Sequence, residues 1–154
     1  MTNSQYLILN IDDHNFAAKV SNIEDVIQLS KTTPVPLSKD TIGGLLNLRG
    51  HIVTEIDVSK TLGIDTEVKD GYAVVITTPQ DEFYSLSFEG IGDVIEIGFS
   101  DIEPLPETVQ KSWHSVSKGV YRNDDQLIVI LDLDMFIDHL IDDEDSENLE
   151  GQFA

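Results

Sequence analysis

The stretch that decides the fold is Gly44-Leu45-Leu46-Asn47-Leu48-Arg49-Gly50-His51-Ile52-Val53-Thr54-Glu55-Ile56-Asp57-Val58. Apolar residues alternate with polar ones before the glycine at position 50, which is typical of a half-buried strand. β-Branched residues dominate after it and favour a second strand. Gly50 can adopt the positive φ that a tight hairpin turn needs. The stretch therefore predicts a β-hairpin whose turn is Arg49-Gly50-His51.

The rest of the chain predicts short strands and few helices. Runs of alternating or β-branched residues between turn residues predict strands at 6–11, 16–20, 26–29, 72–77 and 83–88. Short helical segments are expected at 21–25, at 59–63, within 107–118 and at 134–141. Asp12-Asp13-His14-Asn15 is expected to be a hairpin turn. These elements predict a mainly β protein.

The sequence contains two copies of one unit. Four landmarks recur in the same order about 70 residues apart, as expected of a repeat with insertions in its loops. They are Ile23–Ile27 with Ile91–Ile95, Pro34-Val35-Pro36 with Pro104-Leu105-Pro106, Gly44 with Gly119, and Ile56-Asp57-Val58 with Leu131-Asp132-Leu133. The copies span roughly residues 6–63 and 72–140 and predict two small barrels of about five strands each. Because small units bury little surface alone, the barrels are expected to share an interface, with strands exchanged between them as one option.

The composition argues against several classes of function. The chain has 154 residues, a formal net charge of −20 and no cysteine, so it offers no disulfide framework and no thiolate metal site. Its charge repels nucleic acids and anionic lipid surfaces. Its apolar runs are far shorter than the roughly 20 residues that span a bilayer, and its first residues lack a signal-peptide pattern. We therefore expect a cytoplasmic domain without membrane insertion or a nucleic-acid partner.

Acidic residues concentrate near the end of the sequence. Seven of them lie between Asp138 and Glu150, where no lysine or arginine occurs. Residues 142–154 are therefore expected to form an acidic flexible tail. The overall charge fits either a basic partner or a well-solvated exterior, and the second interpretation is the simpler one.

The sequence does not predict catalytic or metal-binding chemistry. Its four histidines are His14, His51, His114 and His139. None has the spacing that indicates a catalytic triad, and Asp12-Asp13-His14 lacks the spacing of a zinc site. Gly90-Ile91-Gly92 has Ile95 where a dinucleotide-binding loop needs its third glycine. We expect no enzymatic activity, no cofactor and no metal, and we expect Trp113 and Phe136 to lie in the core.

The hairpin sequence resembles that of the CheW family of chemotaxis coupling proteins. The resemblance spans about residues 5–141 and rests on Asn47-Leu48-Arg49-Gly50, Ile56-Asp57, Asp93-Val94-Ile95 and the late Gly119…Leu131-Asp132-Leu133 strand. It implies an all-β fold of two intertwined five-stranded SH3-like barrels. It also implies a scaffold that couples chemoreceptors (methyl-accepting chemotaxis proteins) to the histidine kinase CheA in bacterial or archaeal chemotaxis. A CheW-like adaptor of another chemosensory pathway, such as surface motility or second-messenger control, is the alternative.

The resemblance also implies partners and binding residues. The partners are the cytoplasmic tip of the chemoreceptor and the regulatory domain of CheA, in receptor arrays at the inner membrane. By position, the receptor-binding residues are Ile23, Gly44, Asn47, Leu48, Arg49 and Gly50. The kinase-binding residues are Ile91, Asp93, Val94 and Gly119.

Arg49 has two interpretations that the sequence leaves open. It can form an internal ion pair with Asp25 or with Asp57, or it can contact a partner directly. Where this chain has Asp25, the family usually has glutamate. The aspartate side chain is one methylene shorter, so a pair with Arg49 would differ slightly in geometry.

Overall fold

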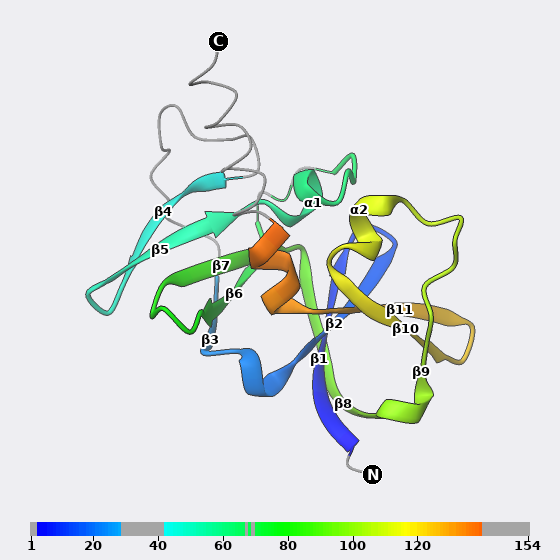
Figure 1. Ribbon diagram of the computed structural model, residues 1–154. Helices are drawn as coiled ribbons and strands as arrows, with labels where there is room; N and C mark the ends of the chain where they lie inside the picture. Colours follow the sequence, from blue (N-terminus) through cyan, green and yellow to red (C-terminus); the bar gives the residue numbers. More distant parts are fainter. Residues whose placement is uncertain (1–2, 29–41, 67, 69, 140–154) are drawn as a thin grey trace.

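Eleven strands form two curled sheets in the part of the chain that the structure describes (Figure 1). The structure is a computed structural model, and it describes residues 3–28, 42–66, 68 and 70–139. The Pro34-Val35-Pro36 landmark of the repeat and the tail expected at 142–154 lie outside these residues. The predicted mainly β class is confirmed.

The first sheet has six strands in the order β8-β1-β2-β11-β10-β9. Their bounds are β1 Asn3–Ile11, β2 His14–Lys19, β8 Gly90–Gly98, β9 Ile102–Glu103, β10 Ser117–Asn123 and β11 Gln126–Leu131. The sixth strand goes beyond the expected five, because the two-residue β9 pairs with β10 at the edge of the sheet.

The second sheet has the expected five strands, in the order β3-β6-β7-β5-β4. Their bounds are β3 Asp25–Gln28, β4 Ile42–Leu48, β5 His51–Ile56, β6 Tyr72–Thr77 and β7 Phe83–Phe88. Its two edges are β3 and β4, which belong to the same half of the sequence.

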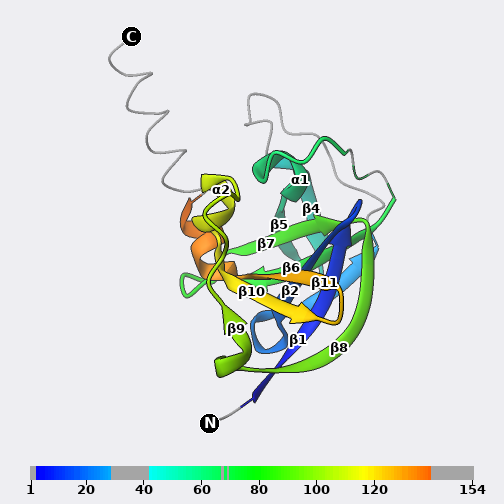
Figure 2. The ribbon, with the colours of Figure 1, turned by 90° about the vertical axis from the view of Figure 1, so that its right-hand side faces the viewer.

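The two sheets are intertwined because each sequence half gives its first hairpin to the other half's sheet. The β1–β2 hairpin joins β8 to β11, and the β6–β7 hairpin joins β3 to β5. Each junction has one parallel pair: β2 with β11, and β5 with β7. Figure 2 shows β1 and β8 running together along the six-stranded sheet. The intertwined arrangement implied by the family resemblance is therefore present.

The repeat landmarks have structural counterparts. β4 has a register shift between Ile42 and Gly44, and β10 has one between Ser117 and Gly119, so both glycines follow a bulge. Asp57 caps α1 (Val58–Thr61) by accepting a hydrogen bond from the Lys60 amide. Asp132 accepts one from the Met135 amide in the helix at residues 133–139. Each unit thus ends in a strand followed by an aspartate-capped helix.

The main core contains side chains from both sheets. Phe16 on β2 and Phe88 on β7 are fully buried, with ring centroids 6.2 Å apart. Phe136 of the 133–139 helix is also fully buried in this core, as expected. Trp113, on α2 (Lys111–His114), packs against the main core, and its ring centroid lies 5.5 Å from that of Phe16. A smaller cluster fills the six-stranded sheet: Tyr6, Ala17, Ile97, Ile128 and Ile130.

Local predictions needed three corrections. The first hairpin turn is shorter than expected, because His14 and Asn15 already pair within β2. The helical segment expected at 21–25 is a 3-10 helix at Val20–Asn22, which has no side-chain cap. In the central hairpin, His51 opens β5 and lies outside the turn.

Candidate protein-interaction surface

The β4–β5 turn consists of Arg49 and Gly50, with φ values of 52° and 85°. Two successive residues with positive φ give a type I′ turn, whose twist matches that of the flanking strands. The Asn47 side-chain oxygen accepts a hydrogen bond from the Gly50 amide at 3.2 Å. Three residues of Asn-Leu-Arg-Gly thus have a local role in the turn. The asparagine side chain stabilises it by a hydrogen bond, the glycine adopts its positive φ, and the arginine lies at its tip. Figure 1 shows this hairpin projecting from the five-stranded sheet.

Arg49 forms an exposed ion pair with Asp25. Its Nη2 lies 3.4 Å from Oδ2 of the aspartate, and the two side chains are 80% and 29% exposed. Asp25 lies on β3, so the pair links the turn after β4 to the opposite edge of the same curled sheet. Asp57 instead accepts hydrogen bonds from Ser59 and from the Lys60 amide. The pair holds the guanidinium in place and leaves most of it accessible to a partner.

The outer face of the hairpin carries apolar side chains. Ile52 pairs in register with Asn47, and Leu45 lies on the same face two residues earlier. Ile52 is 69% exposed and Leu45 is 38% exposed, whereas the neighbouring Val53 is fully buried. We call Leu45, Asn47, Arg49 and Ile52 the hairpin surface. Large exposed apolar side chains beside a charged tip are typical of a docking surface.

Sequence reasoning missed Leu45 and Ile52 as surface residues. A usable signal was present, because successive side chains of a strand point to opposite faces and Ile52-Val53 are both apolar. One of the two had to face outward. Which one does so depends on the core on the other side of the hairpin.

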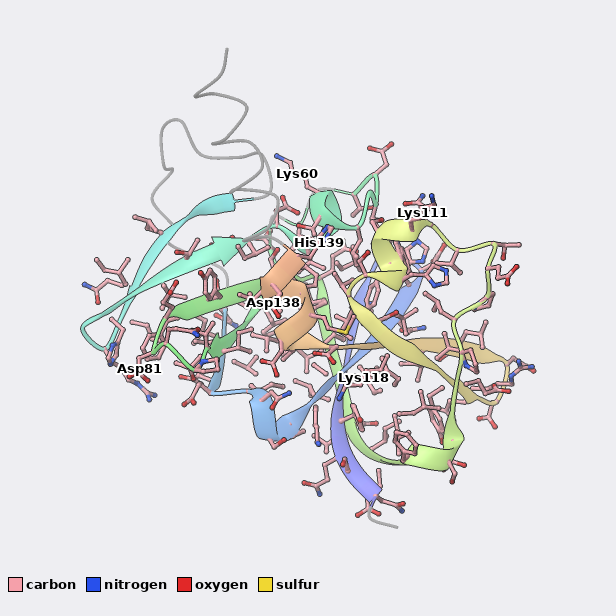
Figure 3. The ribbon with its side chains drawn as sticks, viewed as in Figure 1. Lys60, Asp81, Lys111, Lys118, Asp138 and His139 are labelled. Atoms are coloured by element: carbon pink, nitrogen blue, oxygen red, sulfur yellow. The ribbon has the colours of Figure 1, made fainter. Side chains whose placement is uncertain are left out.

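A shallow hollow of about 450 Å³ adjoins the hairpin surface. It lies between β5 and the start of β7, where the ring of His51 packs on that of Phe83 with centroids 4.3 Å apart. Ile52 lines one side, and Asp81 and Glu82 line the other. Figure 3 shows Asp81 at the turn between β6 and β7. A partner side chain entering here would meet an apolar wall and two carboxylates.

The structure places the expected receptor-binding residues as follows. Asn47, Leu48, Arg49 and Gly50 lie together at the turn, and Leu48 is half-buried. The backbone of Gly44 lies further back on β4, opposite Glu55. Ile23 is partly buried against the main core, two residues before the ion-paired Asp25.

The expected kinase-binding residues do not form one cluster. Asp93 and Val94 are exposed on β8, with Val94 51% exposed, while Ile91 packs against the main core. Gly119 is buried on β10, which β8 does not neighbour in the sheet. A Cβ on Gly119 would collide with the backbone oxygen of Glu103, so this glycine lets β9 approach β10. Val94 and Asp93 are the members of the set that a partner could reach.

The described histidines make structural contacts. The ring of His14 lies edge-on to Trp113 at 5.3 Å, and Nε2 of His114 lies 3.1 Å from the backbone oxygen of Pro106. Among the residues that the structure describes, no group of three or more His, Asp or Glu side chains could hold a metal ion. Over the same residues, no helix has the length and apolarity needed to cross a membrane.

Two intertwined, curled β-sheets with an exposed hairpin surface define a two-barrel β module. A family model described as a CheW-like domain matches residues 5–140. The chain is 29% identical over 136 residues to the chemotaxis protein CheW of Thermotoga maritima, covering 88% of this chain and 89% of that one. It is 26% identical over 138 residues to the chemotaxis protein CheW of Bacillus subtilis, covering 89% and 88% of the two chains.

A solved structure shares the fold. The scaffolding protein TtCheW from Thermoanaerobacter tengcongensis superposes with a TM-score of 0.76 at 23% identity, covering 86% of each chain. The matched family model covers nearly all of the described residues, so the chain belongs to the CheW family.

Proposed function

We propose that this protein couples chemoreceptors to the histidine kinase CheA. In this role the hairpin surface binds the cytoplasmic tip of a receptor, and the exposed part of β8 binds the regulatory domain of the kinase. The receptor contact is proposed because of the position of Arg49. Its side chain pairs with Asp25 at the tip of the hairpin, remains 80% exposed, and lies on the same hairpin as the exposed Ile52.

The chemistry of the hairpin surface suits a helical partner. An amphipathic helix could place an apolar residue against Leu45 and Ile52 and an acidic residue against the guanidinium of Arg49. Asp81 and Glu82, which line the adjoining hollow, would accept a basic residue from the same helix. Apolar contacts would supply affinity, while the charges would set orientation.

The receptor contact is tested by calorimetric titration with a receptor-tip fragment. Arg49→Ala is expected to weaken binding about tenfold, the equivalent of about 1.4 kcal/mol. Arg122→Ala is the matched control, because Arg122 is also exposed and also forms a 3.4 Å ion pair, with Glu103 on the other sheet. Equal affinities for the two variants would contradict the receptor role of the hairpin.

The kinase contact is tested with the isolated regulatory domain of CheA. Val94→Asp puts a charge on the exposed part of β8 and should reduce this binding while leaving the receptor fragment bound. Ile52→Asp should instead reduce binding of the receptor fragment and leave binding of the kinase domain unchanged. Folded wild-type protein that binds neither partner would refute the coupling function.

A further inference from the structure

The six-stranded sheet has an open hollow of about 840 Å³ at one end. Apolar side chains of Tyr6, Ile97, Phe99 and Ile102 line it. Phe99, on the short turn Phe99–Asp101, is 79% exposed, the largest exposed fraction among the large apolar side chains of the described residues. A hollow of this size is large enough for several side chains of a peptide.

The charge at this hollow is opposite to that of the whole protein. Lys19 and Lys118 line it, and neither forms an ion pair with any residue that the structure describes. Its acidic member, Glu103, is already paired with Arg122, whose Nε lies 3.4 Å from the carboxylate. In a chain with 29 acids and nine basic residues, two lysines thus line one largely apolar hollow, and a third basic residue, Arg122, pairs with its single acidic lining residue.

The end of the sequence has the complementary composition. Residues 142–153 contain six acids and no basic residue, with Leu149 and Phe153 as apolar members. We propose that this acidic segment docks in the hollow of its own chain. Its carboxylates would face Lys19 and Lys118, and its apolar side chains would pack on Phe99. This inference does not depend on the proposed partners.

The segment is long enough to reach the hollow. The 15 residues after His139 can span about 50 Å when extended. A domain of this size has a radius of gyration of about 14 Å and is thus about 37 Å across, so the extended segment covers most of the roughly 58 Å between opposite points along its surface. Because the segment is tethered, its effective concentration at the hollow is on the order of millimolar, so weak contacts suffice for substantial occupancy. An untethered acidic peptide would instead have to overcome repulsion by a protein of charge −20.

The proposal is tested by paramagnetic broadening in the full chain. The protein has no cysteine, so Gln152→Cys allows a single nitroxide label to be attached without changing the charge. We expect the amide signals of Tyr6, Lys19 and Ile97 to lose intensity relative to the reduced, diamagnetic label. Raising the salt concentration to about 0.5 M should restore part of this intensity, because the Debye length then shrinks to a few ångströms.

Variants at exposed positions separate docking from random contact. Lys118→Glu with Phe99→Ser should abolish the broadening. Lys111→Glu with Leu127→Ser makes the same charge change, removes another exposed apolar side chain at a position that does not line the hollow, and should preserve the broadening. In Figure 3, Lys111 lies on α2, well away from Lys118. Absence of broadening in the labelled parent, or its survival in the first variant, would refute the proposal. Broadening that grows with protein concentration would assign the contact to a second copy and equally refute docking within one chain.

Discussion

Arg49 occupies a backbone conformation that costs a non-glycine residue free energy. Its φ of 52° is left-handed, and an L-residue there loses about 1–2 kcal/mol relative to the right-handed region. The exposed ion pair with Asp25 stabilises the fold by at most about 1 kcal/mol. Local stability alone therefore does not favour arginine over glycine at this position. A side chain retained at such a cost is consistent with a role outside the fold.

This balance predicts the stability of two variants. Arg49→Ala loses the ion pair without relieving the backbone, so the free energy of unfolding should fall by up to about 1 kcal/mol. Arg49→Gly also loses the pair but relieves the left-handed conformation, so it should be at least as stable as the alanine variant. Urea unfolding of both proteins measures the difference. A glycine variant clearly less stable than the alanine variant would show that the strain argument is wrong.

Gly50 and Gly119, two of the positive-φ glycines, differ in their surroundings. A Cβ at Gly119 would meet the backbone oxygen of Glu103, and backbone cannot move aside as a side chain can. Gly119→Ala should therefore cost about 1–3 kcal/mol or more. At Gly50 nothing lies within 4 Å, so Gly50→Ala should cost only the conformational term of about 1–2 kcal/mol. Denaturant midpoints of the two variants test this order, and a more harmful Gly50→Ala would reverse it.

At this scale the sequence predicted the turn better than the surface. Gly50 marks the turn because the residue type itself permits positive φ. The two candidate partners of Arg49 could be named from their charge, but only the curl of the sheet brings Asp25 to it. Likewise, the outward face of Ile52 depends on core side chains supplied by distant strands.

The strand-and-helix element that closes each unit depends on one aspartate. Asp57 accepts hydrogen bonds from the Lys60 amide and from Ser59, which is fully buried. Asp132 accepts one from the Met135 amide. Each replacement by alanine should cost about 0.5–2 kcal/mol, the usual value of a helix cap. Asp57→Ala should cost more, because it also leaves the buried Ser59 hydroxyl without this acceptor.

Asp138→Ala is the matched control for the capping prediction. Asp138 is exposed on the helical segment 133–139, beyond its first turn, where a carboxylate cannot cap the free amides of the helix N-terminus and alanine is the better helix former (Figure 3). Its removal should leave stability unchanged or raise it slightly. Thermal or urea unfolding distinguishes the three variants, and equal losses at all of them would mean that net charge, and not capping, sets the effect.

Elements were predictable where a local rule defines them. The recurrence of aspartate at positions 57 and 132 could be seen in the sequence. Both units begin a helix directly after a strand, and both use aspartate as its cap. The pairing partners of the strands were not, because a period of two fixes which face a strand buries and says nothing about its neighbour. The parallel contact of β5 with β7 and the extra pairing of β9 with β10 both arise from tertiary packing.

At the scale of the whole molecule, the exchanged hairpins join the two sheets into one unit. Neither sequence half completes a sheet without a hairpin from the other, and Phe16 and Phe88 meet in a common core. The hollow of the six-stranded sheet also needs both halves of the sequence, because Lys19 comes from the first half and Lys118 from the second. Such features could not be predicted from local sequence.

This architecture predicts a single cooperative unfolding transition. Trp113 is the chain's only tryptophan; it packs on Phe16 of one sheet and donates a hydrogen bond to the backbone oxygen of Leu62, which follows α1 and the other sheet. Its fluorescence therefore reports the junction, while far-ultraviolet circular dichroism reports both sheets. The two signals should change at the same urea concentration. Phe16→Ala and Phe88→Ala should each lower stability by about 3–5 kcal/mol and shift both signals together. Separate transitions, or a variant that melts one sheet alone, would show that the sheets are independent in spite of their exchanged strands.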